Sequence, residues 1–176
     1  MVMWRGATDN PRPALVAVPS GRAYAIASPP QNALVRRELA AELQRVLERF
    51  AREAGFSEKS PVSLFFKPGV VGHHQVGRAA DIYAAGGVGL DEWKRRWDIA
   101  IQLAANPEER QRLLNQERQR NLGWRLYKAL QIYGEWARPT GYPIQLFGPW
   151  TRSEGPLKSI SDGLLHAHRD HIHVAK

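Results

Sequence analysis

All six histidines of this chain lie in two short stretches of the sequence. The pair His73 and His74 begins one stretch, which ends at Asp81, and the other four lie between His166 and Lys176. Imidazole binds metal ions and transfers protons near neutral pH, and carboxylates often complete such sites. We therefore predict that the two stretches meet in the fold and build one metal site.

The closing stretch has the alternation of a β-strand. In His171-Ile172-His173 a period of two places both imidazoles on one face of the strand, and Ile172 and Val174 on the other. Asp170 comes immediately before and supplies the carboxylate of this cluster. The pattern orients two histidines toward one centre, although only one of them needs to bind a metal.

The upstream stretch supplies a second carboxylate. His74 and Asp81 are seven residues apart, and the glycine and alanines between them let the backbone pack closely while the ends of the loop converge. A histidine, a carboxylate and a second histidine form a suitable zinc set, with a fourth position open for water.

Together the two motifs resemble those of a known family. His74-x-x-Gly-x-Ala-x-Asp81, followed near the end by Asp170-His-x-His173, is similar to the zinc D-Ala-D-Ala peptidases. These are peptidoglycan carboxypeptidases and endopeptidases, related in fold to the hedgehog signalling domain. The resemblance covers roughly residues 60–85 and 165–175, with helical material between them.

The resemblance assigns a role to each of five residues. It implies that zinc is the cofactor and that His74, Asp81 and His173 bind it. Asp170, three residues before the last ligand, is expected to act as the general base. His171 is expected to stabilise the reacting carbonyl. The implied substrate is a peptidoglycan stem peptide or cross-link, which favours a periplasmic or extracellular site of action.

Two features depart from the family pattern. Gly72 stands where the family commonly has a serine, and the family's carboxylate-binding arginine has no counterpart after the preceding strand. Lys67 and Arg78 are the candidates for binding the substrate instead, although a lysine lacks the bidentate fork of arginine. His168 and His73 are candidates for supporting the ligand histidines.

The elements that must position these residues suggest a single domain. Residues 1–30 are predicted to form an N-terminal extension, in which Leu15–Val18 and Ala23–Ala27 make a hairpin. Residues 31–176 are predicted to form the zinc peptidase domain.

Apolar periodicity and capping residues predict four helices and three strands in that domain. The helices are expected from Asn32 to about Ala54, Asp91 to about Ala105, Asn106 to about Asn121, and Gly123 to Trp136; the strands are Pro61–Phe66, Tyr142–Phe147 and His171–Val174. This order indicates an α+β fold of the hedgehog/D,D-peptidase type, in which helices pack around a small antiparallel sheet that carries the zinc site.

The composition limits the kinds of partner that we expect the protein to bind. The net charge of +8 suits an anionic cell-wall polymer, and nucleic acid is not the expected partner. The absence of cysteine excludes disulfides and thiolate metal ligands. The sequence contains no apolar run long enough to span a membrane, and its first residues lack the apolar core of a signal peptide.

Two alternative functions remain open at this point. His-hydrophobic-His is also the metal pair of single-strand DNA nicking enzymes, which need a helical tyrosine such as Tyr127 or Tyr133. That interpretation leaves the upstream motif unexplained. A catalytically silent, hedgehog-like zinc-binding module is the third interpretation, and the presence of Asp170 argues against it.

Overall fold

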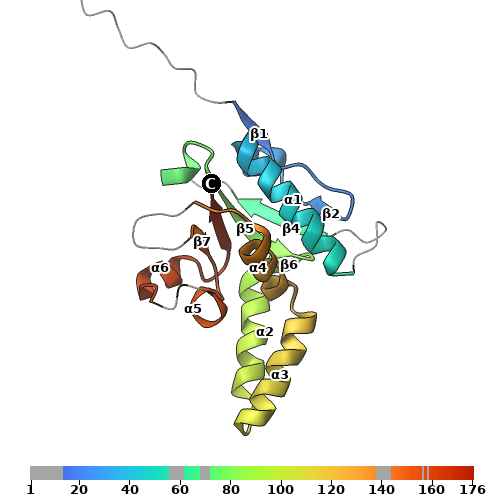
Figure 1. Ribbon diagram of the computed structural model, residues 1–176, viewed down its shortest axis with the longest axis vertical. Coiled ribbons are helices and arrows are strands. Elements are labelled where there is room, and N and C mark those ends of the chain that lie inside the picture. The colour runs from blue at the N-terminus through green and yellow to red at the C-terminus, as the bar shows by residue number, and fades with distance from the viewer. Residues whose placement is uncertain (1–13, 56–61, 68–71, 138–143, 156, 158) are drawn as a thin grey trace, which may run out of the picture.

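A computed structural model describes residues 14–55, 62–67, 72–137, 144–155, 157 and 159–176 (Figure 1). The helices are α1 (Arg37–Glu53), α2 (Leu90–Gln102), α3 (Pro107–Arg120), α4 (Leu122–Tyr133), α5 (Thr151–Glu154) and α6 (Asp162–Ala167), with 3-10 turns η1 (Pro30–Ala33) and η2 (Gly72–His74). The strands are β1 (Leu15–Ala17), β2 (Tyr24–Ile26), β3 (Leu34–Arg36), β4 (Val62–Lys67), β5 (Ala79–Ala85), β6 (Val88–Gly89), β7 (Leu146–Phe147) and β8 (Ile172–Ala175). Over these residues the protein is a mixed α/β structure.

The main sheet carries the two strands of the histidine motifs at its centre. Its strand order is β2-β4-β5-β8-β7, and β6 pairs with β5. The pairs β4–β5, β5–β8 and β7–β8 are antiparallel, as the sequence predicted, but β2 and β4 are parallel. The long connection through α1 explains this difference, because a crossover returns the chain to the same end of the sheet.

The prediction of an N-terminal hairpin is wrong. β1 pairs with β3, with Val16 opposite Val35, while β2 joins the edge of the main sheet beside β4. Both segments are short apolar runs, and such a run does not identify the partner of a strand.

The first long helix begins later than predicted. Leu34–Arg36 is extended because it pairs with β1, so α1 starts at Arg37 rather than near Asn32. The other three helices are confirmed with small shifts at their ends. The strand expected from Tyr142 is confirmed at Leu146–Phe147, and Tyr142 lies outside the described residues.

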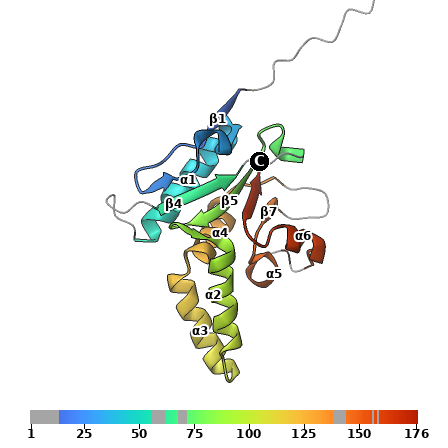
Figure 2. The same ribbon diagram turned by 180° about the vertical axis from the view of Figure 1, so that it is seen from behind.

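α1 and α4 cover one face of the main sheet, as the two opposite views show (Figures 1 and 2). Their apolar residues form one core with alternate residues of β5 and β8. Fully buried members of this core are Leu43, Val46, Leu47, Leu126, Leu130, Ile82, Ile172 and Val174. Since neighbouring residues of a strand point to opposite faces, Asp81 and His173 project from the other face of the sheet.

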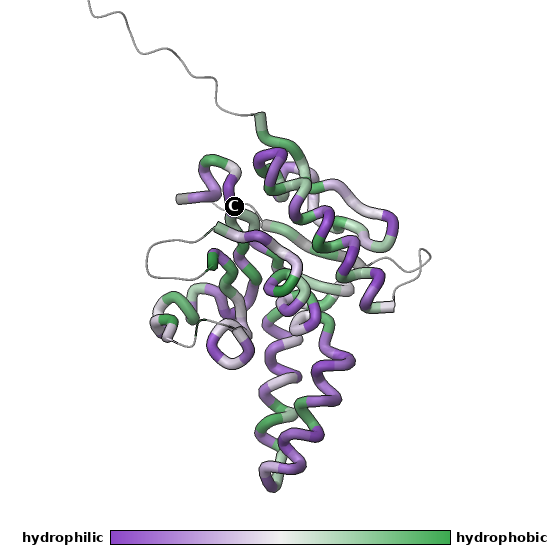
Figure 3. Tube along the Cα trace, viewed as in Figure 1, coloured by the Kyte–Doolittle hydropathy of each residue, from purple (hydrophilic) through white to green (hydrophobic). Residues whose placement is uncertain are grey.

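α2 and α3 form a helical pair that extends away from the sheet (Figures 1 and 2). α3 is largely hydrophilic (Figure 3), and Glu117 is its one buried residue. Asn121 ties this pair to α4: its Nδ2 donates to the Trp93 carbonyl at 2.8 Å, and its Oδ1 accepts from the Trp124 amide at 3.0 Å. No helix within the described ranges is long and apolar enough to cross a membrane.

Candidate metal centre

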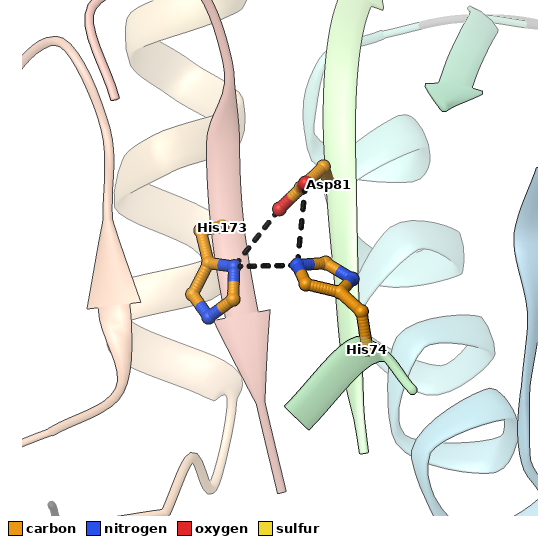
Figure 4. Close-up of side chains that lie close together, drawn as sticks. All are labelled: His74, Asp81 and His173. Carbon is orange, nitrogen blue, oxygen red and sulfur yellow. Dashed lines mark hydrogen bonds and ion pairs between the residues drawn. The ribbon is translucent and has the colours of Figure 1, made fainter. Parts of the chain in front are cut away.

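Three elements bring the predicted zinc ligands together. His74 lies in η2, Asp81 in β5 and His173 in β8. Asp81 and His173 are directly opposite each other in the antiparallel pair of strands, so their side chains leave the same face of the sheet. In Figure 4 the three side chains point toward one another.

The donor atoms of the three side chains lie close enough together to share one metal ion. His74 Nε2 lies 3.2 Å from His173 Nδ1 and 3.3 Å from Asp81 Oδ2, and His173 Nδ1 lies 2.9 Å from Asp81 Oδ1. With zinc–ligand distances of about 2.0–2.1 Å, ligand atoms of a tetrahedral site are roughly 3.3 Å apart. Two imidazole nitrogens and one carboxylate oxygen are therefore a group that could hold a metal ion.

A glycine turn delivers His74 to this point. Gly77 has a φ of +69°, its amide donates to the His74 carbonyl at 3.0 Å, and its carbonyl accepts from the Arg36 amide at 2.7 Å. A Cβ on Gly77 would lie 2.2 Å from Leu15 Cδ2 and 3.1 Å from the Arg36 nitrogen. Glycine is required here both for the positive φ and for the close approach of β3.

The charges of the buried ligands suit metal binding. Burial raises the pKa of Asp81, but hydrogen bonds with His173 and His74 outweigh it and hold that pKa well below its usual range. Burial lowers the pKa of His173 more than its contact with Asp81 raises it. At neutral pH the carboxylate is thus ionised and His173 is neutral, which are the protonation states that bind a metal ion.

Asp170 and His171 form a pair at the edge of this cluster. Nδ1 of His171 lies 2.8 Å from Asp170 Oδ1, and its Nε2 lies 3.7 Å from Asp81 Oδ1. The His171 side chain is 10% exposed, whereas that of Asp170 is 49% exposed. One imidazole thus connects a solvent-accessible carboxylate to the group that could hold a metal ion.

Two aromatic residues that sequence reasoning missed hold the histidines in place. Tyr83 stacks on His171 with ring centroids 4.7 Å apart, and Phe147 stacks on His173 at 6.0 Å. Burial, together with the negative charges of Asp81 and Asp170, raises the pKa of Tyr83 to about 12. Tyr83 is two residues after Asp81, so the period of a β-strand puts both side chains on the same face of β5. This spacing is the signal in the sequence that could have indicated Tyr83.

The remaining predicted residues lie at different distances from the centre. The His168 ring packs against His171 and His173, with centroids 5.0 and 5.4 Å away, and its Nδ1 donates to the Leu164 carbonyl at 2.8 Å. This contact is consistent with the supporting role predicted for His168. His73 is exposed, and only its backbone carbonyl has a described contact, with the Arg78 amide at 2.8 Å.

Neither of the two predicted substrate-binding cations has a described side-chain contact with the candidate ligands. Nε of Arg78, which is exposed, donates to the Lys176 carbonyl at 2.9 Å. Lys67 pairs with Asp81 in the backbone register of β4 and β5, but its side chain lies outside the described part of the chain.

Known proteins add no constraint to this site. Comparisons with protein-family models, with curated protein sequences and with solved structures found no match to the chain.

Proposed function

We propose that this protein is a zinc-dependent peptidase that hydrolyses amide bonds in peptidoglycan stem peptides or cross-links. The observation that carries the proposal is the convergence of His74, Asp81 and His173 beside the Asp170–His171 pair. The donor set suits zinc, and the accessible carboxylate next to it suits proton transfer.

The three ligands would hold the ion on the face of the sheet opposite the one that α1 and α4 cover. Their side chains are 9–12% exposed, so they are largely desolvated. A bound zinc ion supplies Lewis-acid polarisation of a carbonyl oxygen and activation of water. Phe147 and Tyr83 keep the imidazoles in position through ring contacts.

Asp170 and His171 would carry the proton transfers. The described contacts of Asp170 involve Oδ1, so Oδ2 would be the oxygen that takes a proton from the attacking water and returns it to the leaving amine. When both nitrogens of His171 are protonated, Nδ1–H donates to Asp170 and Nε2–H can donate to the oxyanion that develops on the carbonyl. Such a donor is worth a few kcal/mol, about 3, in comparable sites.

The contacts of the helical tyrosines favour the peptidase over a DNA nicking enzyme. Tyr127 is completely buried and its hydroxyl contacts Thr151 Oγ1 at 3.3 Å. The Tyr133 hydroxyl lies 2.9 Å from both carboxylate oxygens of Glu53, on α1. Nicking needs the hydroxyl of a helical tyrosine beside the metal, and neither of these two tyrosines has a described contact with the candidate ligands.

The choice of peptidoglycan rests on the resemblance of the two motifs and on charge. The net charge of +8 would concentrate the protein at an anionic cell-wall polymer. A silent zinc-binding module would not need an accessible carboxylate such as Asp170 beside its ligands.

Digestion of purified peptidoglycan by the zinc-loaded protein tests the proposal. Mass analysis of the products should reveal cleaved cross-bridges for an endopeptidase, or shortened stem peptides for a carboxypeptidase. Asp170→Ala is the matched control and should release neither product while it keeps its zinc. Single-stranded DNA is incubated in parallel, and nicked DNA with intact peptidoglycan would refute the peptidase.

A further inference from the structure

A groove begins at Asp170 and runs along α2. One wall is the turn that carries Arg169 and Asp170, and the other is the helix surface that carries Lys94, Arg95, Asp98 and Ile99. Its volume is about 530 Å³, within the range of ligand-binding pockets. Because Asp170 lines this groove and also contacts His171, the groove lies beside the candidate metal centre.

The cations on the α2 wall are already engaged by carboxylates. Lys94 Nζ lies 2.5 and 2.6 Å from the two oxygens of Asp98. Arg95 binds Glu92 through two hydrogen bonds of 2.7 and 2.9 Å. Their charges are therefore largely neutralised within α2.

Arg169 differs from these two residues. Its described contact is with Nδ1 of His166 at 3.5 Å, and its exposed guanidinium makes no ion pair with a described carboxylate. Guanidinium binds carboxylates through two parallel hydrogen bonds, a geometry that the ammonium group of lysine does not provide. Among the groove cations, Arg169 is thus the one whose guanidinium has no carboxylate partner within the described part of the chain.

We propose that this groove binds the substrate in an extended form and that Arg169 anchors a carboxylate of it. The inference rests on the proposed function, because it treats Asp170 as the reacting end of the groove. Arg169 and Asp170 are adjacent in the chain, and an extended peptide advances about 3.3–3.6 Å per residue. The anchored carboxylate would therefore belong to a residue within about two positions of the cleaved bond.

Two sources could supply that carboxylate: the C-terminus of the peptide or an acidic side chain. Both present the same planar acceptor to Arg169, so the contact itself does not distinguish them. The two sources lead to different substrates, since a terminal carboxylate implies removal of end residues and a side-chain carboxylate permits internal cleavage.

Calorimetric titration of the zinc-loaded protein with three N-acetylated peptides tests the inference. One is an alanine tetrapeptide with a free C-terminus, the second is its C-terminal amide, and the third is an amide that contains one glutamate. For a peptide that the protein cleaves, KM is measured in place of Kd. At least one carboxylate peptide should bind about tenfold or more tightly than the neutral amide, and the one that does identifies the source.

Arg169→Gln should reduce that preference to within about twofold. Arg95→Gln is the matched control: it removes the same charge from the same groove, but from a guanidinium held by Glu92, and should keep the preference. Equal binding of all three peptides, or an unchanged preference in Arg169→Gln, would overturn the inference. Selective binding without cleavage would instead count against the peptidase and leave the groove assignment standing.

Discussion

Replacement of Gly77 by alanine should both destabilise the fold and weaken zinc binding. The φ of +69° costs an alanine about 1–2 kcal/mol. The new Cβ would also lie 3.1 Å from the Arg36 backbone nitrogen, which adds about 1–2 kcal/mol of overpacking. Its contact with Leu15 is cheaper to relieve, because that side chain is 41% exposed and can rotate. The expected loss is about 2–4 kcal/mol of unfolding free energy.

Gly55→Ala is the matched control for this prediction. Gly55 has a φ of +78°, but nothing lies within 4 Å of a Cβ built there, so only the cost of about 1–2 kcal/mol for the backbone applies. Urea unfolding of the zinc-free proteins measures the two losses. Competition with a chelator should show zinc affinity reduced about 10–100-fold in Gly77→Ala, because the turn that positions His74 shifts, and unchanged in Gly55→Ala. Equal stability and equal zinc affinity of the two variants would refute the reasoning.

Three further predictions concern the residues around the ligands. Asp170→Asn should retain one zinc ion by mass spectrometry and lose about 100-fold or more in peptide hydrolysis; near-normal turnover would remove its role as base. Tyr83→Ala should lower kcat because the ring that stacks on His171 is lost, whereas Tyr83→Phe should keep most activity; similar losses in both would implicate the hydroxyl instead. Burial lowers the pKa of His168 from 6.5 to about 4, so below pH 6.5 the unfolded chain binds the proton first and stability falls as the pH approaches 4. This loss, about 1–2 kcal/mol after allowance for solvent contact, should shrink in His168→Gln when urea unfolding of the zinc-free protein is followed against pH.

The local pattern of the sequence predicted most elements but not all of their partners. α2, α3 and α4 follow from apolar periodicity and from caps such as Asn106, whose side chain accepts the Glu109 amide at 2.8 Å. The pairing of β1 with β3 could not be predicted, because hydrogen bonds between distant strands leave no local pattern. The late start of α1 is a consequence of that pairing.

The candidate site, like the fold, could be predicted from the sequence only in part. The ligand group could be predicted because His74, Asp81 and His173 belong to two recognisable motifs. Phe147 could not, because its place beside His173 depends on the register between β7 and β8. The groove was also beyond sequence reasoning, since α2 and the Arg169–Asp170 turn are far apart in the chain and meet only in the fold.

Zinc stoichiometry tests the central claim most directly. The wild-type protein should bind one zinc ion per chain, as should His73→Ala, which alters an exposed neighbour of the first ligand. Asp81→Ala and His173→Ala should each lose bound zinc, because each removes a donor of the His-Asp-His group. One zinc ion retained by both ligand variants, or none bound by the wild-type protein, would contradict the site.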